Sequence, residues 1–344
     1  MSGANASPTG RSHLEMSGAN ASPTGRSHLE MSAAMLEVDS LVRSFGGLRA
    51  VDNVSFKVGK GQVLGFIGPN GAGKTTTMRI LATLDLPQDG DARIGGVSVV
   101  EYPEEARRLT GFMPDYAGVY ISTTVAEYLD FFARSYGIRG AARKKSVEGI
   151  IEFMGIGDLR DRQVESLSKG LQQRVALGRA IIHDPQLLIL DEPAANLDPR
   201  ARIEFRTLIR ELAADGKTVL LSSHILTELS EICDEVAVIE KGRILATGTV
   251  QDILRGLRRH RILSLRLVSR NESIERFLFE QHGVLKVHDA GDSGRYQFEF
   301  EGDDQAQTVL LQRLISAGFP VLEFNAHDAG LEDLFMKITE GRVQ

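Results

Sequence analysis

The sequence predicts an α/β fold in which buried strands alternate with helices, followed by a smaller α+β domain. Residues 63–67 (VLGFI), 186–192 (QLLILDE) and 218–222 (TVLLS) are compact apolar runs. Such runs are typical of parallel strands that are buried on both faces. A segment with helical spacing of its apolar residues, 74–84, follows the first run directly. We therefore expect a strand–helix alternation built around these three strands.

Further strands and one helix complete the predicted core. Residues 203–213 have the pattern of a helix between the second and third apolar runs. Lys241 and Gly242 separate two short strand-like segments, as the turn of a hairpin does. The additional strands are expected at 36–43, 54–58, 236–239 and 243–246.

Residues 122–183 change in character and predict a mostly helical subdomain inserted into this core. Thr124 and Glu127 have the spacing of a capping box, and apolar residues on one helical face follow them. A second helix is expected over 147–154, and a third begins near Ser168.

The last part of the chain, 251–344, predicts a separate domain. Its patterns follow the order βαββαβ, which favours a ferredoxin-like α+β sandwich with a regulatory or dimerising role. The expected elements are strands at 262–268, 284–287, 296–301 and 321–325, and helices at 272–282, 306–317 and 331–338.

Composition excludes several classes of protein. Among 344 residues the formal net charge is −6, which argues against a general nucleic-acid binder. The single cysteine, Cys233, excludes an intramolecular disulfide framework and a cysteine-based zinc site. Residues 1–15 recur unchanged as 16–30, and this Ser-, Gly- and Ala-rich stretch predicts a disordered tail over 1–35. No apolar run approaches the ~18 residues of a membrane helix, and no apolar signal core opens the chain.

A phosphate-binding loop is the first chemical motif. It matches G-x-x-x-x-G-K-[ST] in full, between a predicted strand and a predicted helix. Its glycines let successive backbone N–H groups converge on phosphate oxygens, and the helix N-terminus adds partial positive charge. Lys74 is expected to reach the β- and γ-phosphates and the Thr75 hydroxyl to bind Mg²⁺; the alternative is a glycine-rich turn with an accidental lysine. The loop comprises Gly68, Pro69, Asn70, Gly71, Ala72, Gly73, Lys74 and Thr75.

Two acidic residues and a histidine follow the other buried strands. Asp191 ends an apolar strand and is suited to the Mg²⁺ hydration shell, while Glu192 is suited to polarise an attacking water. His224 follows the 218–222 run and is expected to contact the γ-phosphate. Taken alone, each could be an ordinary surface residue at a strand end.

Residues 167–174 (LSKGLQQR) resemble the signature motif of ABC-type ATPases, whose usual form is LSGGQQQR. The order of phosphate loop, helical segment, signature, LLILDEP, AANLD and SSH is also that of this family, over about 36–250. The resemblance implies a phosphate-loop (RecA-like) ATPase core with an antiparallel β subdomain and a helical subdomain. Residues 330–339 (GLEDLFMKIT) are similar to the C-terminal extension of exporter-associated members.

The resemblance implies further binding roles. Phe45 would stack on adenine, with a core phenylalanine as the alternative. Thr76 would complete the nucleotide contacts of the loop. Ser168 and Gly170 would touch the γ-phosphate of ATP bound to a second subunit, so that ATP joins two subunits head to tail. Residues 196–198 would form the loop that passes between the subunits.

The sequence departs from the family pattern at three positions. Asp115 stands where the family usually has a glutamine, and it is expected to serve as a metal-side oxygen ligand. Lys169 replaces a glycine and either adds positive charge near phosphate or faces water. Leu171 replaces a glutamine.

The functional expectation is an ATP- and Mg²⁺-dependent motor subunit of an exporter. It would form a homodimer and couple to a separate membrane permease, with no nucleic-acid partner. Its location would be cytoplasmic and peripheral, on the cytoplasmic face of the membrane. The alternatives are a soluble ABC ATPase without a transport role and a regulator that binds ATP without hydrolysing it.

Overall fold

A six-stranded sheet organises the first part of the chain. The computed structural model describes residues 34–115, 118, 122–195, 197–225, 229–253, 260–271, 273–289 and 294–327. The strand order in this sheet is β10-β9-β3-β8-β7-β6, with every pairing parallel except that of β9 with β10. The strands are β3 (Val63–Ile67), β6 (Thr110–Met113), β7 (Leu187–Leu190), β8 (Thr218–Ser223), β9 (Glu235–Glu240) and β10 (Arg243–Gly248).

The expected buried strands are confirmed. Every residue of β3, β7 and β8 is buried, as their uninterrupted apolar runs predicted. The expected hairpin at Lys241 and Gly242 joins β9 to β10. Parallel pairing brings the carboxyl ends of β3, β7 and β8 to one edge of the sheet, and the chemical motifs follow these ends.

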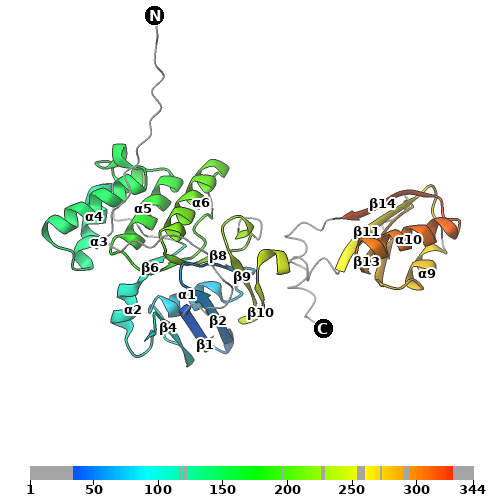
Figure 1. The fold of residues 1–344 in the computed structure, drawn as a ribbon, viewed down its shortest axis with the longest axis horizontal. Coiled ribbons are helices and arrows are strands. Elements are labelled where there is room, and N and C mark those ends of the chain that lie inside the picture. The colour runs from blue at the N-terminus through cyan, green and yellow to red at the C-terminus, as the bar shows by residue number, and fades with distance from the viewer. Residues whose placement is uncertain are drawn as a thin grey trace, which may run out of the picture.

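An antiparallel sheet of order β2-β1-β4-β5 packs on one face of the central sheet. Its strands are β1 (Ala34–Phe45), β2 (Leu48–Gly59), β4 (Asp89–Ile94) and β5 (Val97–Ser98). The structure extends β1 and β2 beyond the predicted ranges, because cross-strand pairing carries the hairpin to the turn at Gly46 and Gly47. The helices α1 (Lys74–Leu81) and α2 (Pro103–Leu109) belong to the same side (Figure 1).

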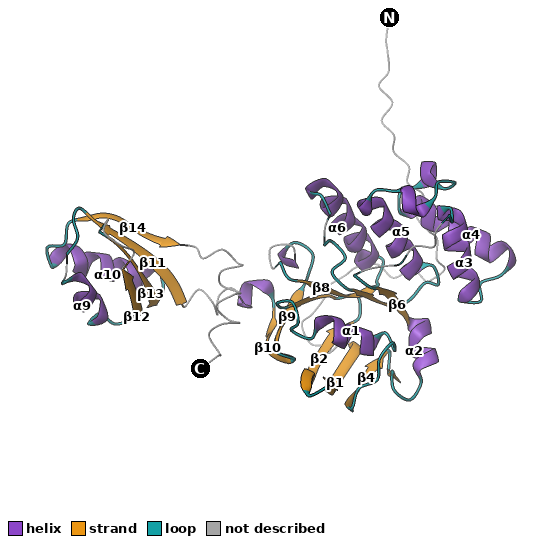
Figure 2. Cartoon of the chain, turned by 180° about the vertical axis from the view of Figure 1, so that it is seen from behind, coloured by secondary structure: helices purple, strands orange, loops and turns teal. Residues whose placement is uncertain are grey.

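The other face of the central sheet is covered by helices (Figures 1 and 2). These are α3 (Val125–Ser135), α4 (Gly140–Phe153), α5 (Lys169–Ile181) and α6 (Pro199–Ala214), with short 3-10 turns at Gly157–Leu159 and Val164–Ser166. The capping box of Thr124 and Glu127 at the start of α3 is confirmed. The expected start of the second helix at 147 was wrong by seven residues, because the exposed first turns of α4 carry no apolar periodicity.

Side chains from the two faces form two separate cores. One core lies between the central sheet and the helices α3 to α6, and Tyr128 and Phe205 are its largest fully buried side chains. The other lies between the central and the antiparallel sheets, where the ring centroids of Phe56 and Phe66 are 5.4 Å apart. The central sheet is therefore shielded from water on both faces, which fixes its carboxyl edge as a rigid platform.

The C-terminal domain is a four-stranded antiparallel sheet with two helices on one face. Its order β12-β13-β11-β14 confirms the predicted ferredoxin-like βαββαβ arrangement. The elements are β11 (His260–Leu267), α9 (Ile274–Phe279), β12 (Val284–Asp289), β13 (Arg295–Glu301), α10 (Asp304–Ser316) and β14 (Val321–His327). The helix expected at 331–338 and the tail over 1–33 lie outside the described residues.

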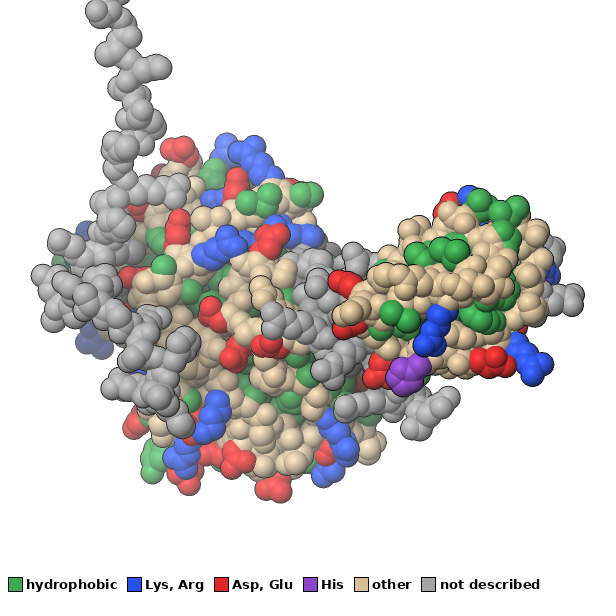
Figure 3. Space-filling model, turned by 45° about the vertical axis from the view of Figure 1, so that its right-hand side comes forward, with side chains coloured by type: hydrophobic (Ala, Val, Ile, Leu, Met, Phe, Trp, Pro, Cys, Tyr) green, Lys and Arg blue, Asp and Glu red, His purple; other side chains and the backbone are tan. Residues whose placement is uncertain are grey.

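The described surface has a mixed charge. In Figure 3, Lys and Arg side chains are interspersed with Asp and Glu side chains on the face turned to the viewer. None of the helices that the structure describes is both long and apolar enough to span a bilayer.

Candidate functional site: a phosphate loop facing two acidic residues

The phosphate loop adopts a backbone that only glycine can supply at two positions. Gly71 has φ +81° and Gly73 has φ +106°, and α1 begins directly after Gly73. A Cβ on Gly73 would lie 2.3 Å from the carbonyl oxygen of Ala50, and a Cβ on Gly68 would lie 2.3 Å from that of Ile239. The loop is therefore pressed between β2 and β9, with its N–H groups at the start of a helix, where an anion is stabilised.

Lys74 lies inside the concave side of this loop. Its side chain is nearly buried, and Nζ donates to the carbonyl oxygens of Gly68 at 2.6 Å and Pro69 at 3.3 Å. The same Nζ lies 3.4 Å from Oε1 of Glu192. The ammonium group thus sits between the loop and the acidic end of β7.

Glu192 contacts both Lys74 and His224. Its Oε2 lies 2.9 Å from Nδ1 of His224, while its buried Oε1 has no hydrogen-bond partner among the described residues. The structure thereby brings together Lys74, Glu192 and His224, which come from three segments far apart in the sequence. An oxygen without a hydrogen-bond partner is available to accept a proton or to hold a water.

Asp191 is buried at the tip of β7 and is held by two hydroxyl groups. The Ser222 Oγ donates to Asp191 Oδ1 at 2.7 Å, and the Thr75 hydroxyl also bonds to this carboxylate. Burial raises the pKa of the Asp191 carboxyl above its ordinary value, while these two hydrogen bonds oppose that shift. Asp191 and Thr75, two of the three expected metal ligands, are thus in direct contact.

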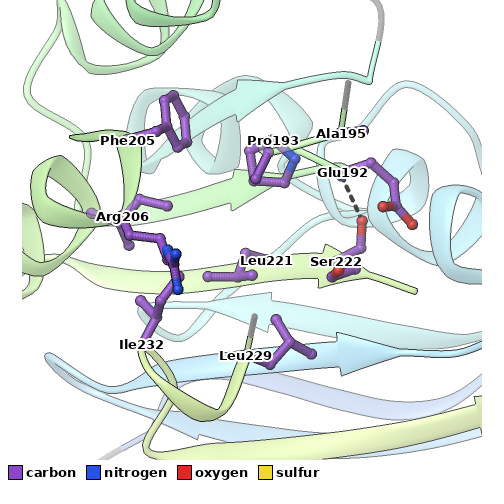
Figure 4. A pocket seen from close by; sticks show the side chains of 12 residues that line it. Glu192, Pro193, Ala195, Phe205, Arg206, Leu221, Ser222, Leu229 and Ile232 are labelled. Atoms are coloured by element: carbon purple, nitrogen blue, oxygen red, sulfur yellow. Dashed lines mark hydrogen bonds between the residues drawn. The ribbon is translucent and has the colours of Figure 1, made fainter. Parts of the chain in front are cut away.

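Figure 4 shows how Glu192 leaves the strand. Its carboxylate points away from the apolar pocket that Phe205, Leu221 and Leu229 line, and its backbone meets Ser222 on β8. Sequence reasoning missed Ser222, although it closes the apolar run of β8. The available signal was a hydroxyl residue at the end of a strand adjacent to the acidic pair.

Asp115 and Phe45 are both exposed. Asp115 is exposed, and its negative charge contributes to raising the pKa of Asp191. Phe45 is 47% exposed at the end of the β1–β2 hairpin, which excludes the alternative of a core phenylalanine. The Arg43 guanidinium lies 4.7 Å above its ring. The opposite ring face is suited to stacking with a flat base.

The signature residues are placed at the start of α5. Ser168 is the N-cap, and its hydroxyl accepts a hydrogen bond from the Leu171 N–H at 3.4 Å. Gly170 is in contact with α6, because an added Cβ would lie 2.9 Å from that of Ala201. None of the contacts described for Ser168 or Gly170 reaches the phosphate loop of the same chain.

The two departures within the signature, Lys169 and Leu171, differ in environment. Lys169 is exposed, as the interpretation of a water-facing residue expects. Leu171 is partly buried against the core of the helical subdomain, which explains an apolar residue there. Asn196 lies outside the described residues, whereas Asp198 caps α6 by accepting from the Ala201 N–H.

Comparisons with known proteins agree with this site. A family profile described as "ABC transporter" matches residues 51–195, and one described as "ATP-binding protein DrrA1-3-like, C-terminal domain" matches residues 248–339. The daunorubicin/doxorubicin resistance ATP-binding protein DrrA of Streptomyces peucetius is 35% identical over 88% of this chain and 92% of its own length. The Nod factor export ATP-binding protein I of Ralstonia nicotianae is 37% identical over 64% of this chain and 68% of its own length.

Solved structures give the same result for the fold. One described as an ATP binding subunit of an ABC transporter has a TM-score of 0.59 and 32% identity, over 64% of this chain and 92% of its own. The chain therefore belongs to the ATP-binding subunits of ABC transporters, and it is an ATPase. Within this family it groups with the exporter-associated members that carry a DrrA-like C-terminal domain.

Proposed function

We propose that this chain hydrolyses Mg²⁺–ATP between two copies of itself and thereby drives export through a separate membrane permease. The main support for this proposal is that Glu192 contacts both Lys74 and His224 at the phosphate loop. Asp191 and Thr75 lie beside them and bond to each other. This set contains a cation for the phosphates, an acceptor for a proton of water and oxygen ligands for a metal. Positioning and charge neutralisation are the main requirements of phosphoryl transfer.

The residues at the site fit Mg²⁺. This ion prefers oxygen ligands and is usually bound through one or two carboxylates together with phosphates. Asp191 supplies one carboxylate and Thr75 one hydroxyl, and the exposed Asp115 offers a second carboxylate from the end of β6. Among the described residues no group of three His, Cys, Asp or Glu could hold an ion alone, which agrees with a site that the nucleotide completes. When bound, the ion would neutralise charge on the β- and γ-phosphates.

The catalytic roles follow from the contacts of Glu192. Its Oε1, which lies 3.4 Å from Lys74 Nζ and has no hydrogen-bond partner among the described residues, would accept a hydrogen bond from the attacking water, while the His224 contact at Oε2 keeps the carboxylate oriented. Lys74 would exchange its carbonyl partners for phosphate oxygens of similar geometry. Thr76 lies in the first turn of α1, where its backbone N–H would be available to the bound phosphates.

A second copy would complete the site. Ser168 caps the 13-residue helix α5, and both Ser168 and Lys169 are exposed. The positive end of this helix is suited to the γ-phosphate of a nucleotide bound to another subunit. Gly170 lets α5 approach α6 closely, which sets the direction in which this end points. ATP would therefore join two chains head to tail.

The transported compound is proposed to be a small bioactive molecule. This inference comes from the relatives, whose names refer to daunorubicin/doxorubicin resistance and to Nod factor export. The chain would be recruited to the cytoplasmic face of the membrane by its permease. The C-terminal domain is proposed to regulate or support assembly of the dimer.

Co-purification tests the proposal. A tagged Glu192→Gln chain is purified from native membranes in mild detergent with Mg²⁺–ATP, and the ATPase rate and the co-purifying proteins are determined. We expect loss of hydrolysis, an ATP-dependent dimer and a stoichiometric multi-span protein. The matched control is Glu211→Gln, which alters an exposed carboxylate on α6 and is expected to hydrolyse ATP normally.

Two outcomes would contradict it. Recovery of the chain without any membrane protein would favour a soluble ABC ATPase. A wild-type chain that binds ATP but whose trace hydrolysis is unchanged by Glu192→Gln would favour the regulatory alternative.

A further inference from the structure

We propose that Ser222 is a positioning residue that holds both acidic residues of the site, fixing Asp191 for the metal and Glu192 for the attacking water. The inference deepens the proposed function and rests on it. Ser222 lies on β8, next to β7, which ends at Leu190 directly before the two acidic residues.

A single oxygen atom links the two carboxylate residues. The Ser222 Oγ donates its proton to Asp191 Oδ1 at 2.7 Å and accepts a hydrogen bond from the backbone N–H of Glu192 at 2.7 Å. Donor and acceptor capacities of the hydroxyl are both used, so its orientation is determined. Ser222 is fully buried and Asp191 is 1% exposed, so water does not compete for these bonds.

The backbone of Glu192 shows why such an anchor is needed. Glu192 has φ +46°, a left-handed conformation that is unfavourable for a residue with a side chain. The conformation turns the Glu192 carboxylate away from the strand direction and toward Lys74 and His224. The hydrogen bond from its N–H to Ser222 holds the peptide at the point where this turn begins.

The chemistry of β8 supports a specific role for the hydroxyl. Val219, Leu220 and Leu221 precede Ser222 and are buried apolar residues in the central sheet. An apolar residue at position 222 would continue this run of buried apolar side chains. An apolar side chain would, however, leave the Glu192 N–H without an acceptor and remove one of the two hydroxyl partners of Asp191.

The test compares three variants in the full chain by steady-state ATPase kinetics. Ser222→Ala removes the hydroxyl, and Ser222→Thr keeps it. The control is Thr218→Val, which removes a fully buried hydroxyl at the opposite end of β8, where it accepts from the Gly61 N–H at 2.9 Å. Melting temperatures and the folded fraction are measured for each variant, so that a loss of stability is separated from a loss of positioning.

Outer-shell partners of catalytic groups typically change activity by 10- to 100-fold when removed. We expect Ser222→Ala to lower kcat by roughly this factor per folded chain and to raise the Mg²⁺ concentration for half-maximal rate, with the KM for ATP nearly unchanged. Ser222→Thr should recover most of kcat. Thr218→Val should lower the melting temperature without changing kcat.

A double-mutant cycle with Glu192→Gln gives the decisive comparison. At saturating Mg²⁺, where the hold of Ser222 on Asp191 no longer limits the rate, adding Ser222→Ala to Glu192→Gln should change the residual rate by less than about twofold. Additive losses, or a kcat for Ser222→Ala within about twofold of the unmodified chain, would overturn the inference. If Glu192→Gln alone keeps the full rate, the proposed role of Glu192 fails as well, which distinguishes the two failures.

Discussion

The stability of this protein should fall in mild acid because of His183. The imidazole follows α5 and stacks on the ring of Tyr136, with centroids 3.6 Å apart and planes within 5°. Its Nε2 lies 3.1 Å from the Thr110 carbonyl oxygen, and its buried Nδ1 has no hydrogen-bond partner among the described residues. A proton on both nitrogens would place a positive charge in this buried site.

The magnitude follows from linkage between protonation and folding. Burial lowers the pKa of His183 to about 4, and the nearby Lys217 charge acts in the same direction. Since the ordinary pKa of an unfolded histidine is about 6.5, the unfolded chain binds the proton more readily. The stabilisation is complete above pH 6.5 and is lost as the pH falls toward 4. At pH 5 this one group should cost at most about 2 kcal/mol of unfolding free energy.

The assay is urea unfolding of the unmodified chain and of His183→Phe at pH 8, 6.5 and 5 and constant ionic strength. A phenylalanine at this position can keep the stack on Tyr136 but loses the hydrogen bond to Thr110. At pH 8 the variant should therefore have a lower free energy of unfolding than the unmodified chain. Between pH 8 and pH 5 the difference between the two proteins should shrink by up to about 2 kcal/mol. A difference that stays constant over this range would refute the reasoning, because other acid-sensitive groups are common to both proteins.

Three further changes test other parts of the structure. Gly73→Ala should abolish ATP binding and lower the melting temperature by more than Gly96→Ala does. Both glycines have a positive φ, but only at Gly73 would an added Cβ lie 2.3 Å from a carbonyl oxygen of β2. Equal effects of the two substitutions would contradict this explanation. Arg43→Gln should raise the KM for ATP about two- to fivefold by removing the cation behind Phe45, and should leave inhibition by inorganic tripolyphosphate unchanged. Thr124→Ala should cost about 1 kcal/mol in urea unfolding by removing the N-cap of α3, and no loss would argue against the capping box.

Much of the site was predictable because its motifs are local. The strand–turn–helix context of the phosphate loop is contained in residues 63–81, and the structure forms it there. The start of α5 at Lys169 follows from Ser168 as a capping residue. The start of α4 was not predictable in the same way, since residues 140–146 carry no large apolar side chain and their helical state depends on continuation into the buried turns.

The ferredoxin-like domain shows how far the order of elements can determine topology. Two βαβ units in one sheet, each with a right-handed crossover, leave few arrangements of four strands. In the observed order β12-β13-β11-β14, each central strand lies between two antiparallel neighbours. The register and the buried aromatic rings of Tyr296, Phe298 and Phe300 then follow from the period of two along β13.

The sequence by itself determined the class of chemistry, because a phosphate loop, an acidic strand end and a signature segment are short stretches whose spacing carries their meaning. Only the tertiary structure decided how these stretches cooperate. The Lys74–Glu192 contact joins positions more than a hundred residues apart, and the Glu192–His224 contact joins positions 32 residues apart. The Ser222 hydroxyl links β8 to the end of the neighbouring strand β7. Such contacts depend on which strands lie side by side and on where each strand ends. Those features are set by burial of the whole sheet rather than by any local pattern.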